Sequence, residues 1–131
     1  MYKIEKKNYG VKLTFEGFIQ KDAMEQWLIE SKKMLPKLSG KFGVFVDMRA
    51  LKPLPRDAQS IMEQGQMLFK KKGMERSVVI LENSVLTMQF RRLAKQSGIA
   101  QWERYIDASD KRNWEILGVD WLQRGLDPDQ R

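Results

Sequence analysis

Two short, almost continuous apolar runs constrain the fold of this 131-residue chain more than any other feature. Residues 42–48 read Phe-Gly-Val-Phe-Val-Asp-Met, and residues 76–82 read Arg-Ser-Val-Val-Ile-Leu-Glu. A strand that is covered on both faces has this pattern, whereas a strand with one wet face alternates. Parallel sheets bury their strands in this way, so the two runs predict the centre of an α/β sheet.

Segments with helical periodicity lie between and around these runs. Asp22 and Glu25 have the spacing of a capping box, and Pro55 and Gly73 suit the start and the end of a second helix. For the last helix, Ser109 or Asp110 is the expected N-cap. Four helices are therefore expected, over residues 22–35, 55–72 and 84–97 and after residue 110.

Three further strands complete the expected order. Residues 11–16 alternate between apolar and polar side chains, and Asn8-Tyr9-Gly10 provides turn chemistry between them and residues 2–8. Trp102 to Ile106 is the last expected strand. The alternation of strands and helices predicts a single α/β domain over residues 1–125, with a mixed, mostly parallel sheet, an N-terminal antiparallel hairpin and about four helices. Residues 126–131 are expected to form a flexible tail.

The chain has no His and no Cys. Their absence excludes zinc fingers, thiolate nucleophiles, disulfides and catalytic triads that use imidazole. We therefore predict no metal site, no cofactor and no catalytic residue. The N-terminus has no apolar signal region, and no window approaches the ~18 apolar residues of a membrane span. A cytoplasmic protein without a transmembrane segment is expected.

Twenty-four basic and 17 acidic side chains give a net charge of +7. The basic residues are spread along the chain among acidic ones, which indicates a solvated surface, and nucleic-acid binding is not expected. The densest run, Lys70-Lys71-Lys72, falls in the last turn of the second helix. Cations at that position favour the negative end of the helix dipole, so the run needs no phosphate ligand.

Asp47 and Asp57 flank the loop that follows the first buried run. Open α/β sheets bind ligands at this edge, and two carboxylates there would serve acid–base chemistry or hold Mg²⁺. The alternative is structural, with Asp47 capping the loop or pairing with Arg49 and Asp57 favouring the dipole of the second helix.

Four arginines form a second candidate site: Arg49, Arg56, Arg91 and Arg92. The first two follow the strand at residues 42–48, and the other two lie within the third helix. If their side chains converge, they form a binding site for a carboxylate or a phosphate, because guanidinium groups bind both in a bidentate manner. If they do not converge, they are ordinary surface charges.

The chain resembles the SpoIIAA-like branch of the STAS domains (sulfate transporter and anti-sigma-factor antagonist) over residues 2–125. The resemblance rests on residues 42–51 followed by a helix, the Phe15-x-Gly17 hairpin, the helix with Trp27, the strand at 102–106 and the closing helix with Trp114 and Trp121. It implies a regulatory or protein-interaction module without enzymatic activity, able to form a homodimer.

In the anti-sigma-factor antagonists of this family, a phosphorylatable serine begins the helix after this strand, whereas this chain has Asp57 there. This departure argues against that switch. Asp57 either imitates phosphoserine with a single charge or has only a structural role at the helix start. The expected partner surface is residues 49–57 with the exposed side of the second helix. The topology is also similar to that of the Sec14-type lipid carriers, which implies a second function: a carrier or sensor of a small apolar or anionic ligand held between sheet and helices.

Overall fold

Residues 1–130 of the computed structural model are described here, and they form five strands and four α-helices. The strands are β1 (Tyr2–Lys7), β2 (Gly10–Gly17), β3 (Phe42–Leu51), β4 (Met74–Leu81) and β5 (Glu103–Asp107). The helices are α1 (Lys21–Met34), α2 (Arg56–Lys71), α3 (Ser84–Ser97) and α4 (Trp114–Arg124). This order confirms the predicted alternation of strands and helices in a single α/β domain.

The strands lie in the sheet in the order of the chain, β1-β2-β3-β4-β5. β1 and β2 pair antiparallel, and every other pair is parallel, which confirms the N-terminal hairpin. The hairpin turn depends on Gly10, because its φ is +142° and a Cβ there would lie 2.2 Å from the carbonyl oxygen of Gly43. Only glycine allows β2 to begin this close to β3.

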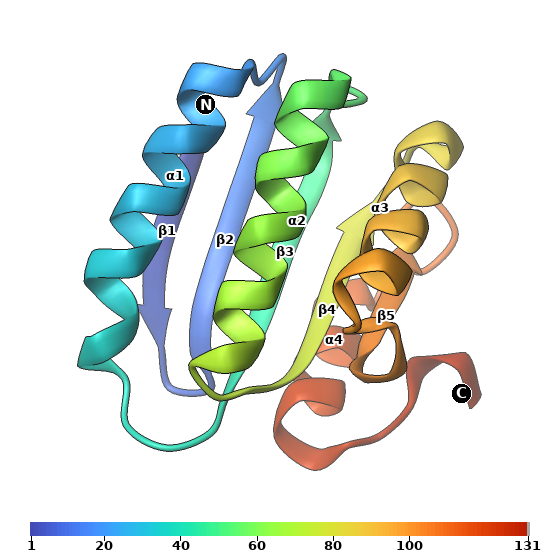
Figure 1. Cartoon of the computed structure of the whole chain (residues 1–131). Coiled ribbons are helices and arrows are strands. Elements are labelled where there is room, and N and C mark those ends of the chain that lie inside the picture. The colour runs from blue at the N-terminus through green and yellow to red at the C-terminus, as the bar shows by residue number, and fades with distance from the viewer. Residues whose placement is uncertain (131) are drawn as a thin grey trace.

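The helices cover both faces of the sheet (Figure 1), with α1, α2 and α3 in front and α4 behind. Each of the first three helices connects a strand to the next strand along the sheet in the same direction. Right-handed crossovers then place all three on one face. No strand follows α4, so it is free to pack on the other face, against β3, β4 and β5.

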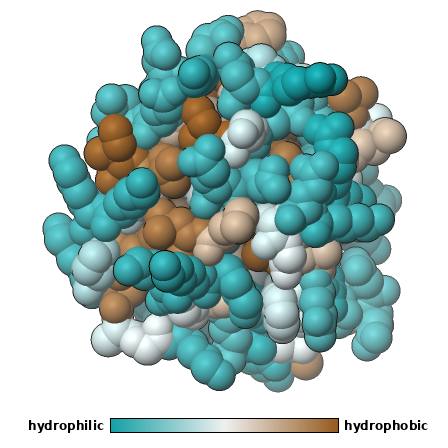
Figure 2. Space-filling model, in the orientation of Figure 1, coloured by the Kyte–Doolittle hydropathy of each residue, from teal (hydrophilic) through white to brown (hydrophobic). Residues whose placement is uncertain are grey.

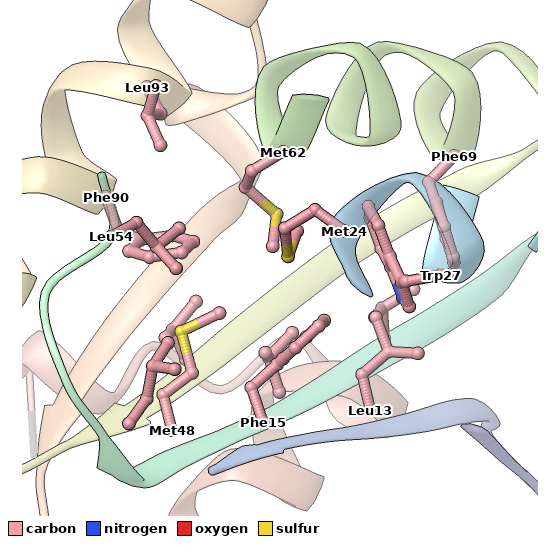
Figure 3. Packing of buried hydrophobic residues seen from close by; sticks show 14 of the residues in the cluster. Leu13, Phe15, Met24, Trp27, Met48, Leu54, Met62, Phe69, Phe90 and Leu93 are labelled. Atoms are coloured by element: carbon pink, nitrogen blue, oxygen red, sulfur yellow. The ribbon is translucent and has the colours of Figure 1, made fainter. Parts of the chain in front are cut away.

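The core therefore has two parts, one on each face of the sheet. Val44, Val46 and Met48 of β3 pack under α1, α2 and α3, whereas Phe45 packs under α4. This double burial explains why β3 reads as a continuous apolar run. In the larger part the Trp27 ring of α1 stacks on Phe69 of α2 with a centroid distance of 5.8 Å (Figure 3).

Two helix starts differ from the prediction. The N-cap of α1 is Gln20 and its side chain makes no capping bond, so Asp22 lies in the first turn and the predicted capping box is wrong. α4 begins at Trp114 after Asn113. The polar residues before it form turns instead, in which Asp107 accepts hydrogen bonds from the backbone N–H and the hydroxyl of Ser109.

Two strand boundaries also differ. β3 continues to Leu51, because β2 keeps pairing with it beyond a register shift, with Glu16 opposite Ala50 and Gly17 opposite Leu51. Arg49 is therefore a strand residue, and the loop before α2 is only residues 52–55. Trp102 lies in a 3-10 turn (η2, Ala100–Trp102) rather than in β5.

The C-terminal segment contacts the end of the sheet. Arg104 of β5 donates two hydrogen bonds to the Asp127 carboxylate, at 3.0 and 3.2 Å. Pro128 is buried, at the start of a 3-10 turn (η3, Pro128–Gln130). These contacts fix the described course of residues 126–130; the flexibility expected for residues 126–131 stays a prediction, and residue 131 lies outside the described residues.

Candidate functional site

Asp47 and Arg49 form a bidentate ion pair on β3. The Arg49 Nε and Nη2 atoms donate to the two Asp47 carboxylate oxygens at 3.0 and 2.9 Å, and the Arg49 backbone N–H donates at 3.2 Å. Burial alone would raise the pKa of the Asp47 carboxyl, but these hydrogen bonds outweigh burial and hold the pKa below its usual value. The carboxylate is thus ionised and satisfied, which agrees with the structural alternative for Asp47.

The ion pair lies on the face of the sheet that α4 covers. The Arg49 guanidinium lies 4.2 Å from the centroid of the Trp114 ring of α4, a cation–π contact. Asp57 lies on α2, which covers the opposite face, so the structure does not bring the two aspartates together. Among residues 1–130 no three His, Cys, Asp or Glu side chains are arranged to hold a metal ion.

Arg56 and Asp57 lie in the first turn of α2, beside an open groove between α1 and α2 with a volume of about 920 Å³. Its apolar lining comes from Leu28, Ile29 and Ile61. Its polar lining comes from Lys21, Glu25, Arg56, Asp57, Ser60 and Gln64. The groove therefore combines an apolar floor with a charged rim, as protein-binding surfaces do.

The two charged side chains of this turn differ in whether they have a hydrogen-bond partner. Asp57 accepts a hydrogen bond from the Ala58 backbone N–H at 2.8 Å, so it stabilises the helix start as its structural alternative predicts. Arg56 is exposed, and within residues 1–130 its guanidinium makes no hydrogen bond or ion pair. It is a free bidentate donor at the end of the groove.

Arg91 does not join Arg49 or Arg56 in one site, and Arg92 is engaged by another side chain. The Arg91 guanidinium lies 4.5 Å from the centroid of the Tyr105 ring. Arg92 donates a hydrogen bond to the side-chain oxygen of Gln59, which ties α3 to α2. Arg49, Arg56 and Arg91 line three different surface depressions, so these three arginines do not converge on a single anion site.

Hydrophobic side chains gather on the part of the surface that α1 and α2 form. Figure 2 shows them there, surrounded by hydrophilic side chains. Ile29 of α1 is 44% exposed and Met67 of α2 is 54% exposed. Met67 follows Ser60 and Gln64 of the groove at helical spacing, so it extends the same surface towards the end of α2.

A buried carboxyl group that the sequence analysis did not identify lies between the sheet and α3. Glu103 accepts a hydrogen bond from the Ser77 hydroxyl at 2.9 Å and one from the Tyr105 hydroxyl at 2.5 Å. Burial raises its pKa to about 7, although both hydrogen bonds act in the opposite direction. The sequence held one weak signal, a glutamate among the apolar residues of the last expected strand, where a buried charge would be costly.

Glu103 also lines a small internal cavity in the position where the carrier alternative places its ligand. Apolar side chains from the sheet and the three front helices enclose it, and Gln66, Ser77 and Glu103 are the polar groups in its wall. The cavity volume is about 30 Å³. This holds about two water molecules, whereas sites for small organic ligands measure roughly 300–1,000 Å³.

Comparison with protein-family models, with curated proteins and with solved structures finds no match for this chain. None of the helices in residues 1–130 is both long enough and apolar enough to cross a membrane.

Proposed function

We propose that this protein is a non-enzymatic protein-interaction module that binds a partner in the groove between α1 and α2. The observation that carries the proposal is the free Arg56 guanidinium at the end of an open groove with an apolar floor. An exposed apolar surface with a charged rim is typical of a binding site, and arginine is among the residues that contribute most binding energy.

The groove also defines the chemistry of the partner. An amphipathic segment would place apolar side chains against Leu28, Ile29 and Ile61 and a carboxylate against Arg56. A carboxylate side chain of a protein partner suits this position because it accepts both arms of a guanidinium. The resemblance to the SpoIIAA-like branch supports the same class of function, a regulatory module, and the groove includes Arg56 and Asp57 of the expected partner surface.

The carrier of a small ligand is the weaker alternative. Its support is a cavity with buried polar groups, but the volume of about 30 Å³ excludes a lipid-like molecule without a large expansion of the core. The groove is open and needs no such rearrangement. The open groove therefore favours the protein-interaction function over the carrier function.

Site-specific photo-crosslinking tests the proposal. A photoreactive amino acid replaces Ser60 in the groove, and Gln123 on α4 serves as the control position, since both side chains are exposed. The partner that is crosslinked in cells only from position 60 is identified by mass spectrometry, produced separately and used for affinity measurements. A product of twice the mass of the chain identifies a second copy as the partner.

The affinity measurement uses two matched double variants. In the groove variant, Ile29→Glu and Arg56→Glu, we expect the Kd to rise about 30-fold or more, as at the centre of an interface. In the control variant, Ile116→Glu and Arg112→Glu, the same charge changes fall on exposed residues around α4, and the Kd should stay within about threefold. Equal affinities of the two variants would overturn the proposal.

A further inference from the structure

Three segments that are distant in the sequence meet at the lower end of the molecule in Figure 1, where α1 and α2 end and the β1–β2 turn lies. The Gly43 backbone N–H donates to the Tyr9 carbonyl at 2.7 Å, and the Phe42 backbone N–H donates to the Gly73 carbonyl at 3.2 Å. These bonds hold the hairpin turn, the start of β3 and the end of α2 side by side.

The segments that meet there are rich in lysine. We call the following nine residues the lysine pole: Lys6, Lys7, Lys32, Lys33, Lys37, Lys41, Lys70, Lys71 and Lys72. All are exposed except Lys70, which is half-buried. Among the described residues, two of these lysines form ion pairs, and both pairs are long: Lys7 with Glu5 and Lys41 with Glu75, each at 3.9 Å. When the two paired glutamates are subtracted from the nine lysines, the surplus charge is +7, which equals the net charge of the whole chain.

Helix stability explains only part of this concentration of charge. Lys32, Lys33, Lys70 and Lys71 lie in the last turns of α1 and α2, where cations favour the helix dipole. Lys72, the C-cap of α2, shares this role. Lys6, Lys7 and Lys41 lie in no helix, because they belong to the hairpin and to the segment just before β3. Like charges gathered at one end of a molecule repel each other, so the surplus points to an anionic partner.

The composition of the lysine pole favours an anionic bilayer over a nucleic acid. The segments that supply it, residues 6–7, 32–41 and 70–72, contain no arginine, the residue suited to bidentate contacts with phosphates and bases. Arg76 lines a depression with Lys41 and Lys70, but its guanidinium donates to the Leu122 carbonyl at 3.1 Å and pairs with Glu75 at 3.4 Å. The neighbouring aromatic ring, Trp102, is covered by Lys70, whose Nζ lies 3.9 Å from the ring centroid, so the ring is not free to stack on a base. Flexible ammonium groups spread over one end of a molecule match a diffuse layer of lipid headgroups.

We propose that the lysine pole docks this protein on membrane surfaces that carry anionic phospholipids. The half-buried side chains of Met34 and Leu38 lie in the same segment as four of the lysines and provide apolar contacts at the headgroup level. In this orientation the first turn of α2, with Arg56, points away from the bilayer, because the lysines lie at the other end of the helix. The groove stays accessible to a partner while the protein is on the membrane.

Vesicle flotation tests this inference. The purified chain is mixed with vesicles of phosphatidylcholine alone or with about 30% phosphatidylglycerol, at about 0.1 M salt. We expect flotation only with the anionic vesicles, and release at about 0.5 M salt, where the screening length is much shorter. Absence of binding to the anionic vesicles, or equal binding to both, would overturn the inference.

Two triple variants with the same change in net charge separate the lysine pole from overall charge. The pole variant carries Lys33→Glu, Lys37→Glu and Lys71→Glu, and the control carries Lys21→Glu, Lys52→Glu and Lys111→Glu, all at exposed positions. We expect the pole variant to partition about 100-fold more weakly and the control less than about tenfold. Circular dichroism verifies that both variants are folded, and equal losses in the two contradict the inference.

A duplex DNA of about 20 base pairs is the competing ligand in the same assay. If the lysine pole is a membrane surface, anionic vesicles retain the protein in the presence of an equal concentration of DNA phosphate. If DNA removes the protein from the vesicles and the pole variant loses DNA binding, the partner is a nucleic acid and the membrane inference is wrong.

Discussion

Glu103 shows how one buried carboxyl group can make the stability of the fold depend on pH. Its neighbour Tyr105 has a single hydroxyl hydrogen, yet this hydroxyl lies 3.1 Å from the Phe90 carbonyl and 2.5 Å from the Glu103 carboxyl. If Glu103 is protonated, it donates to the Tyr105 oxygen, and the tyrosine hydrogen remains for Phe90. The neutral acid therefore satisfies every group, and the ionised form does not.

We expect the free energy of unfolding to fall as the pH rises from about 4.5 to above 7. In the folded state, burial raises the pKa of Glu103 from 4.5 to about 7. Its charged or titratable neighbours, Tyr105 and Arg91, both act to lower this pKa. Below the lower value the group is protonated in both states, and its contribution is lost as the pH passes the upper value. The loss amounts to about 3 kcal/mol.

The variant Glu103→Gln isolates this effect, because an amide resembles the neutral acid. Urea unfolding at pH 5 and pH 8, monitored by tryptophan fluorescence, should show a smaller decrease with pH for this variant than for the natural chain. Glu16→Gln, at an exposed position, serves as the control and should follow the natural chain. The same pH dependence in all three proteins would contradict the assignment.

At the residue scale, the sequence was informative where partners are close along the chain. Asp47 and Arg49 are two positions apart on one strand, so their side chains point to the same face, and pairing was one of the alternatives stated for them. Glu103 and Ser77 are 26 positions apart and meet only because the register of β4 and β5 sets them opposite each other. No local pattern predicts such a register.

At the element scale, the contact between α1 and α2 depends on Gly65. A Cβ at this position would lie 2.2 Å from Cη2 and 2.3 Å from Cζ3 of Trp27. The ring cannot move away easily, because it stacks on Phe69 and meets Phe15 edge-on at a centroid distance of 5.5 Å. Because Gly65 has no side chain, α2 can pack directly against the Trp27 indole of α1.

Gly65→Ala should therefore destabilise the protein by about 2 kcal/mol, although alanine is normally the better helix former by about 1 kcal/mol. Chemical unfolding measures the difference. The adjacent variant Gln64→Ala, at an exposed position, should change the stability by less than about 0.5 kcal/mol. A stabilised Gly65→Ala variant would show that the helices adjust without strain.

The elements themselves were predictable, because a buried strand and an amphipathic helix have different hydrophobic periods. The first residues of the helices were less predictable. Polar residues near a start can cap the helix or close a turn of their own, and Asp107 with Ser109 does the second. The ends were clearer, since α3 ends at Gly98, which has a φ of +87°, and α2 ends just before Gly73.

At the scale of the whole molecule, charge is unevenly distributed. The nine lysines of the lysine pole and their ion-pair partners Glu5 and Glu75 together carry +7, so the remainder of the chain is close to neutral. Repulsion within the lysine pole destabilises the folded state at low ionic strength more than at high ionic strength. The sequence could not show this, because the lysines come from three separate segments that only the fold brings together.

Thermal unfolding should reveal this repulsion. Raising sodium chloride from about 0.02 M to about 0.3 M should raise the Tm by about 4 °C, which corresponds to about 1 kcal/mol for a domain of this size. The pole variant, with its three lysines replaced by glutamate, should lose most of this increase. A Tm of the natural chain that is independent of salt would show that the lysines do not interact.

The order of the strands across the sheet has a consequence for folding of the nascent chain during synthesis. Because each strand pairs with the one synthesised before it, the sheet can grow outward as the polypeptide leaves the ribosome. No later strand has to be inserted between two that have already paired. In a partially synthesised chain, the sheet therefore grows at one edge only, and the next strand to be synthesised pairs with that edge.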